Sequence, residues 1–332
     1  MNYKVLGRTG VLVSELCLGT MSFGGDADEQ EAARMFARCR DAGINFFDCA
    51  NVYCKGKSEE ILGRLISACR DEVVITSKAT QQTGKDINAL GSSRRHIMLE
   101  VEKSLKRLQT DRIDLYFIHH FDCLTPIDES LRALDDLVRQ GKLLYIGASN
   151  WAAWQTAKAL GISAGQGLAR FECIEPMYNL VKRQAEVEIL PLALSENLGV
   201  IVYSPLAGGL LSGKYSRGNK GTAGRIVQKG SYIKRYSDPV YFEIAARLVD
   251  FAESVHTHPV TLAVSWVRTH PAVTAPIIGA RNVSQLEPSL AAADFNMTPD
   301  LRAEISKLSV QPPNATDRLE EVIDPNFYFR NR

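Results

Sequence analysis

The chain alternates between short β-branched apolar runs and longer segments whose apolar residues recur every three or four positions. Ala32, Met35, Phe36 and Cys39 share one helical face in this way. Such alternation is typical of βα units built around a parallel sheet. Eight segments have the composition of strands: 15–18, 45–47, 73–77, 113–118, 143–147, 172–175, 200–203 and 273–278.

The intervals between successive strand ends predict one domain. All but one have the length of an ordinary βα unit, and no linker-like stretch separates two halves. The exception runs from Tyr203 to Gly279 and contains a basic, glycine-rich stretch around 218–235 with the character of a lid. We therefore predict an α/β fold, a single (β/α)8 TIM barrel over residues 1–332 with a long lid insertion between its last two strands.

Further elements are expected outside the barrel. Residues 4–6 and 11–13 flank the turn sequence of 7–10, which predicts a small β-hairpin that would close the N-terminal mouth. Near the other end of the chain, Thr298 is expected to cap an extra amphipathic helix that ends near Leu308.

The composition argues against several classes of partner. The 39 basic and 38 acidic residues give a formal net charge of +1, whereas nucleic-acid and polybasic membrane binders need excess Lys and Arg. No secretory-signal pattern and no apolar stretch of the ~18 residues that span a membrane is seen. Seven scattered cysteines indicate reduced thiols. We expect a cytoplasmic globular protein that acts on a small molecule, with no nucleic-acid or membrane partner; its oligomeric state is not predicted.

Polar side chains follow several of the predicted strands where the strands end. Asp48, Lys78, His119 and Ser149 each occupy such a position, and Tyr53 follows Asp48 closely enough to fold back over the same mouth. In a (β/α)8 barrel the C-terminal strand ends converge on one site. One such residue has an ordinary explanation as a rim residue, but four indicate an active site.

These residue types suit general acid catalysis. A tyrosine has an ordinary pKa of about 10, and a nearby lysine ammonium favours its phenolate. Asp48 would hold the Lys78 ammonium, and His119 would hydrogen-bond beside the reacting oxygen. The set predicts that Tyr53 is a general acid. It would protonate the oxygen of a carbonyl group while a hydride is transferred to the carbonyl carbon.

The sequence resembles the aldo-keto reductases over nearly its whole length. The matching motifs are Gly19-Thr20-Met21, Asn45-Phe46-Phe47-Asp48 with Tyr53, Ile75-Thr76-Ser77-Lys78, Ile113-Asp114-Leu115-Tyr116 with His119, Gly147-Ala148-Ser149-Asn150, Tyr203-Ser204-Pro205-Leu206 with Gly208-Gly209-Leu210-Leu211, and Ile278-Gly279-Ala280-Arg281-Asn282. The resemblance implies a catalytic tetrad of Asp48, Tyr53, Lys78 and His119.

The resemblance also implies NADPH bound across the barrel mouth. Ser149 and Asn150 would hold the nicotinamide carboxamide, Tyr203 would stack on the ring, and Arg281 would meet the 2′-phosphate. No set of four Cys, His or acidic residues has the sequence spacing of a zinc site, so no metal is expected. The implied cofactor residues are Gly19, Thr20, Met21, Asp48, Ser149, Asn150, Glu175, Tyr203, Ser204, Pro205, Leu206, Gly208, Leu210, Lys214, Ile278, Gly279, Arg281 and Gln285.

Aromatic residues near the same strand ends predict a pocket for a small or medium carbonyl compound. The expected lining is Phe23, Tyr53, His119, His120 and Phe121, with Tyr232 or Tyr236 of the insertion as further candidates. The sequence does not indicate which aldehyde, ketone or sugar is the substrate.

Two departures from the family pattern affect the cofactor. Glu175 stands where many members have Gln; it would accept a hydrogen bond from the carboxamide, or it is a protonated or rim-paired carboxyl. Residues 286–289 lack the usual adenine contacts, so the preference for NADPH over NADH rests on Arg281. Cys49 and Cys54 flank the tetrad residues and are expected to serve packing, with oxidation of Cys54 as the alternative.

A second function fits the same fold. Voltage-gated potassium channel β subunits are similar barrels that bind the cofactor mainly as sensor or partner proteins. The prediction is nevertheless an NADPH-dependent carbonyl reductase, with a sensor of weak or no turnover as the alternative.

Overall fold

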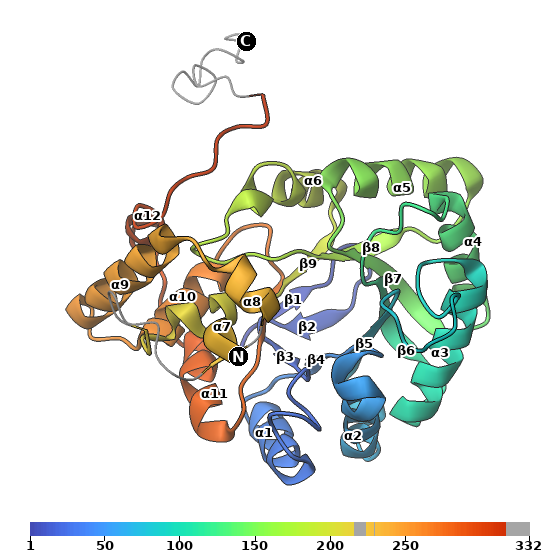
Figure 1. Ribbon diagram of the computed structural model, residues 1–332, viewed down its shortest axis with the longest axis horizontal. Helices are drawn as coiled ribbons and strands as arrows, with labels where there is room; N and C mark the ends of the chain where they lie inside the picture. Colours follow the sequence, from blue (N-terminus) through green and yellow to red (C-terminus); the bar gives the residue numbers. More distant parts are fainter. Residues whose placement is uncertain (216–223, 229, 317–332) are drawn as a thin grey trace.

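The structure is a computed structural model that describes residues 1–215, 224–228 and 230–316. Eight parallel strands close into a barrel in the order β10-β3-β4-β5-β6-β7-β8-β9, with helices around it (Figure 1). This confirms the predicted (β/α)8 fold and all of its strands. The strands are β3 (Cys17–Gly19), β4 (Phe46–Asp48), β5 (Val74–Ala79), β6 (Ile113–Ile118), β7 (Leu143–Ser149), β8 (Phe171–Glu175), β9 (Gly199–Val202) and β10 (Ala275–Ile278).

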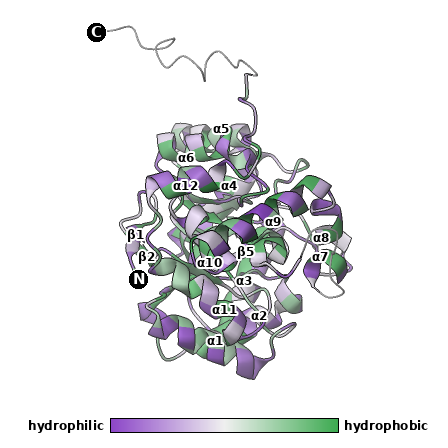
Figure 2. Cartoon of the chain, turned by 90° about the vertical axis from the view of Figure 1, so that its left-hand side faces the viewer, coloured by the Kyte–Doolittle hydropathy of each residue, from purple (hydrophilic) through white to green (hydrophobic). Residues whose placement is uncertain are grey.

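The helices α1 and α3 are amphipathic, as their periodicity predicts, whereas nearly all of α10 is buried. In α1 the predicted face is buried, and the Asp28 side chain caps the helix by accepting from the Glu31 amide. Hydrophobic and hydrophilic residues alternate along α1 and α5 in Figure 2. The helices are α1 (Glu29–Asp41), α2 (Lys57–Ile66), α3 (Arg94–Leu108), α4 (Ile127–Arg139), α5 (Ala153–Gln166), α6 (Ile189–Glu196), α9 (Pro239–Ser254), α10 (Pro259–Arg268), α11 (Val283–Leu290) and α12 (Pro299–Ser306). Within the described residues, no helix is both long enough and apolar enough to pass through a membrane.

The N-terminal hairpin closes the bottom of the barrel, as predicted. β1 (Tyr3–Val5) pairs antiparallel with β2 (Leu12–Ser14). Leu6 and Val13 are buried inside the barrel against apolar residues of its strands, among them Phe46, Leu115 and Ile201. Water is therefore kept out of the barrel interior from this end.

The long insertion contains more helix than its glycine content predicts. Residues 216–223 and 229 of the basic stretch lie outside the described residues. The described part of that stretch forms two short helices, α7 (Arg225–Gln228) and α8 (Gly230–Arg235), between the 3-10 segment η4 (Ala207–Ser212) and the longer helices α9 and α10. The predicted C-terminal helix is α12, with Thr298 as its N-cap.

The buried floor gives a testable prediction for stability. Leu6→Ala should lower the free energy of unfolding by about 2–5 kcal/mol because it leaves a cavity in the barrel floor. The matched control is Leu12→Ala in the same hairpin, since Leu12 is 56% exposed and Leu6 1%. Urea unfolding measures both changes, and equal losses for the two variants would show that Leu6 does not pack as described.

Candidate active site

The barrel brings the predicted polar residues to one end. Asp48 ends β4, Lys78 lies near the end of β5, and Ser149 and Glu175 are paired at the ends of β7 and β8. His119 directly follows β6. Because the strands are parallel, these side chains meet at the C-terminal mouth.

Asp48 and Lys78 form an ion pair in the barrel interior. Lys78 Nζ lies 2.5 Å from Asp48 Oδ1 and donates to the Cys49 carbonyl at 2.9 Å. The Thr76 hydroxyl donates to the same carboxylate oxygen at 2.5 Å. Burial would lower the pKa of Lys78, but the charges of Asp48 and Glu175 outweigh it and raise that pKa well above its ordinary value. The ammonium therefore stays charged without water.

Tyr53 lies over this ammonium. It begins the 3-10 segment η1 (Tyr53–Gly56), whose next residues, Cys54 and Lys55, have φ of 48° and 58°. Lys78 Nζ is 5.3 Å from the centroid of the Tyr53 ring. Burial raises the pKa of Tyr53, while Lys78 acts in the opposite direction. The predicted effect of Lys78 is present, but burial outweighs it, so the phenol keeps its proton at neutral pH.

His119 and His120 form the next part of the wall. The two rings stack at a centroid distance of 5.0 Å, and His119 lies edge-on to Tyr53 at 6.2 Å. Burial, then Lys78 and His120, lower the pKa of His119 well below its ordinary value. His119 is therefore a neutral ring at neutral pH. Gln81 Nε2 lies 2.9 Å from His120 Nε2; sequence reasoning missed Gln81, although it follows Lys78 at the exit of β5.

The aromatic lining differs in part from the prediction. Phe121 is partly buried and packs edge-on against Trp151 and Trp154, which sequence reasoning did not include. Phe23 and Tyr236 are wholly buried, and both belong to the hydrophobic core of the barrel. Their place in the pocket lining stays a prediction.

A connected set of hydrogen bonds crosses the mouth from β7 to β9. The Tyr203 hydroxyl donates to Asn150 Oδ1 at 2.6 Å, and Asn150 Nδ2 donates to the His119 carbonyl at 3.0 Å. The Ser149 hydroxyl donates to the Glu175 carbonyl at 3.1 Å. These contacts fix the side chains predicted to hold a carboxamide.

Glu175 faces inward. Its carboxylate Oε2 lies 3.3 Å from Lys78 Nζ, and the side chain is buried. Its partner is a catalytic candidate and not a rim residue, so this pairing differs from the rim pairing that the sequence left open.

Three cations gather at the outer part of the mouth. Burial, then Arg281 and Arg225, lower the pKa of Lys214. Asp26 lies 3.6 Å from Arg281 and 4.0 Å from Arg225. Among the described residues, Arg225 and Arg281 share one carboxylate and Lys214 lies near both, an excess of positive charge that favours a polyanion. Sequence reasoning placed Arg225 in the lid and did not assign it to this cluster.

The other predicted cofactor residues divide by exposure. Gly208 and Gly209 have φ of 68° and 98°, where a side chain would be strained, and Tyr232 and Lys214 pack closely against them. Gly19, Met21, Ser204, Leu206, Gly279 and Gln285 reach the surface at least in part, whereas the side chains of Thr20, Pro205, Leu210 and Ile278 are buried and leave at most their backbone to a ligand.

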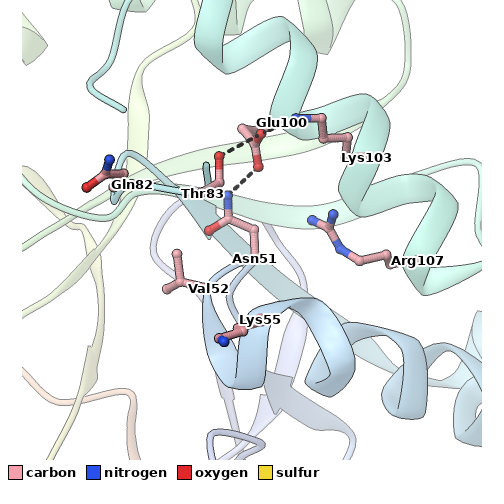
Figure 3. A pocket seen from close by; sticks show the side chains of 8 residues that line it. All are labelled: Asn51, Val52, Lys55, Gln82, Thr83, Glu100, Lys103 and Arg107. Carbon is pink, nitrogen blue, oxygen red and sulfur yellow. Dashed lines mark hydrogen bonds and ion pairs between the residues drawn. The ribbon is translucent and has the colours of Figure 1, made fainter. Parts of the chain in front are cut away.

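A separate pocket of about 170 Å³ lies behind the Tyr53 segment (Figure 3). In it, Asn51 Nδ2 donates to Glu100 Oε2 at 2.6 Å, and Lys103 pairs with the same carboxylate at 2.9 Å. The charges of Glu100 and Lys103 therefore largely neutralise each other. The lining residues are Asn51, Val52, Lys55, Gln82, Thr83, Glu100, Lys103 and Arg107.

The thiols near the site differ in their surroundings. Burial raises the pKa of Cys49 to about 12, so this thiol is not acidified by Lys78, in agreement with the packing role. Cys54 Sγ lies 3.6 Å from the Met21 carbonyl. No group of three or more His, Cys, Asp and Glu side chains suited to a metal ion occurs among the described residues.

Comparisons with known proteins agree with this geometry. The model of the Aldo/keto reductase family matches residues 15–310. The chain is 37% identical to an uncharacterized oxidoreductase, YrpG, of Bacillus subtilis (strain 168), covering 95% of this chain and 98% of that protein. It is 34% identical to a probable voltage-gated potassium channel subunit beta of Oryza sativa subsp. japonica (96% and 99% covered) and 30% identical to the versiconal hemiacetal acetate reductase of Aspergillus parasiticus (90% and 94%).

The buried ion pair leads to a prediction. Lys78→Met should lower the free energy of unfolding by roughly 3–5 kcal/mol, because it leaves the buried carboxylate of Asp48 without its cation. Arg64→Met is the matched control, since Arg64 pairs with Glu29 on the surface and its loss should cost less than about 1 kcal/mol. Adding Asp48→Asn to Lys78→Met should recover part of the loss, because it removes the stranded charge. Thermal or denaturant unfolding gives the values, and similar losses in the two single variants would contradict the pairing.

Proposed function

The chain belongs to the aldo/keto reductase family, and from that premise we propose that it uses NADPH to reduce an aldehyde or ketone to the alcohol, with Tyr53 as proton donor. The observation that carries the proposal is the arrangement of a protonated phenol between a buried ammonium and a neutral imidazole. Such a set can give a proton to an oxygen that is gaining negative charge.

The outer mouth fits a phosphorylated dinucleotide. The cations Lys214, Arg225 and Arg281 would hold its phosphates, and Ser149 and Asn150 its nicotinamide end. The crowding of positive charge around Asp26 is what supports this fit. When bound, NADPH would supply the hydride for the carbonyl carbon.

The chain's own residues supply the proton and the charge. The Tyr53 hydroxyl donates its proton to the carbonyl oxygen. The Lys78 ammonium then stabilises the phenolate that remains, and Asp48 keeps this ammonium charged and in place. A neutral His119 donates a hydrogen bond to the carbonyl oxygen and orients it.

The substrate side of the mouth supports a small or medium carbonyl compound. Tyr53, His119, His120 and Phe121 form its wall, extended by Trp154. The two histidines and the edge-on aromatic rings combine apolar surface with a few hydrogen-bonding groups. The free cysteines of the described residues fit a reducing compartment, and we place the protein in the cytoplasm.

A second candidate is an NADP(H)-binding sensor or partner protein. It is favoured by the similarity to chains whose names describe voltage-gated potassium channel subunits beta. A sensor would bind NADPH and show little or no turnover, whereas a reductase would consume it with simple carbonyl compounds.

Turnover by Tyr53→Phe tests the proton donor. With a reactive aromatic aldehyde and NADPH, kcat should fall by about 10²–10⁴-fold, because the hydroxyl is lost and the ring is kept. Tyr3→Phe is the control, since Tyr3 lies on the N-terminal hairpin and its hydroxyl donates to the Gly43 carbonyl. Wild-type turnover in Tyr53→Phe would contradict the assigned role, and NADPH binding without wild-type turnover would support the sensor.

Arg281→Ala tests the choice of cofactor. The variant should lose most of the preference for NADPH over NADH in kcat/KM, because a guanidinium that meets the 2′-phosphate is removed. Arg247→Ala on α9 is the control, since Arg247 is exposed and faces Glu243. An unchanged NADPH-to-NADH ratio in Arg281→Ala would exclude this residue as the determinant.

A further inference from the structure

Two carboxyl groups share the ammonium of Lys78. Asp48 Oδ1 lies 2.5 Å from Nζ on one side, and Glu175 Oε2 lies 3.3 Å from it on the other. All three side chains are at most 3% exposed. The site would therefore carry one positive and two negative charges if every group were ionised, and water cannot screen them.

The two carboxyl groups are not equivalent. Asp48 accepts hydrogen bonds from the Lys78 ammonium and from the Thr76 hydroxyl. Glu175 Oε2 is buried and faces the ammonium from the longer distance of 3.3 Å, and within the described structure no other donor reaches it. A buried charge needs hydrogen bonds to remain stable, so the surroundings of Asp48 favour a negative charge more than those of Glu175 do.

The remaining titratable groups around this cluster add no compensating charge at neutral pH. Burial raises the pKa of Cys17 on β3 and of Cys173 on β8 well above the ordinary value, so both stay thiols. Tyr53 and Tyr203 keep their protons for the same reason, and Cys49 does as well. His119 at the end of β6 is neutral. Lys78 and Asp48 are thus the charges that act on Glu175.

We propose that Glu175 is a positioning residue for the proton donor: as a neutral carboxyl it leaves the Lys78 charge free to act on Tyr53, and when it ionises it weakens Tyr53 as an acid. The inference rests on the proposed function. It adds a residue that acts through Lys78, and it assigns to Glu175 a role different from contact with the carboxamide.

The direction of the pH dependence follows from the geometry. Burial and the charge of Asp48 raise the pKa of Glu175 to about 8, against the opposing effect of Lys78. Above that pH a second negative charge faces Tyr53 and raises the pKa of its hydroxyl. The rate of carbonyl reduction should therefore fall as pH rises through about 8. The rate of alcohol oxidation should rise, because a more basic Tyr53 phenolate takes the proton in that direction.

The first test is the pH profile of kcat/KM for aldehyde reduction between pH 6 and 10. The wild-type value should fall roughly threefold or more between pH 7 and 9, whereas Glu175→Gln should stay nearly flat across that range because it carries no titrating proton. Glu175→Asp restores a carboxyl group and should restore the fall. Glu172→Gln is the matched control on the same strand, where Glu172 faces Arg170, and should keep the wild-type profile.

The second test needs no turnover. A carboxyl group whose pKa is raised by folding stabilises the protein below its unfolded pKa and loses that contribution as pH rises to the folded pKa. The melting temperature of Glu175→Gln relative to wild type should therefore increase from pH 5 to about 8 and then level off. A difference in melting temperature between the two proteins that does not change with pH would overturn the inference. A Glu175→Gln pH profile of kcat/KM like that of wild type would also overturn it.

The two tests separate the proposals. If wild type turns over no carbonyl compound, the proposed function fails, and the melting temperatures still decide whether Glu175 holds a proton. If turnover occurs and Glu175→Gln changes neither the pH profile nor the pH dependence of melting, the inference about Glu175 alone fails.

Discussion

The ammonium of Lys78 has no contact with water, and much of the site is arranged around that constraint. A buried cation costs several kcal/mol unless it is paired and hydrogen-bonded. Asp48, Glu175 and the Cys49 carbonyl supply the partners, each from a different position around the interior. Tyr53 then lies over a positive charge that water does not screen, as it would at the protein surface.

The barrel makes this arrangement possible. β4, β5 and β8 carry Asp48, Lys78 and Glu175 to the same end because the strands are parallel and the sheet closes. At the opposite end, the hairpin residues Leu6 and Val13 fill the floor with apolar side chains. The low polarity of this interior strengthens the field of Lys78 at Tyr53. The fold and the chemistry thus depend on the same closed core.

Much of this could be predicted from the sequence, since the strand ends, the hairpin and the C-terminal helix depend on local patterns. The pairing of Asp48 with Lys78 also followed from their positions at neighbouring strand ends. The direction of a side chain was harder to predict. Glu175 turns inward to Lys78 and Phe23 turns into the core, because packing among distant segments decides orientation. Arg225 joins Arg281 through the path of the insertion, which no short motif indicates.

The central claim is that Lys78 stays charged inside the barrel and thereby governs Tyr53. NMR of protein labelled at lysine Cε reports the protonation of each lysine, and the Lys78 signal is identified by its absence in Lys78→Met. We expect the Lys78 amine to stay protonated between pH 6 and 10, because the charge of Asp48 raises its pKa and Glu175 raises it further once ionised. A signal typical of a neutral amine at pH 7 would contradict the account.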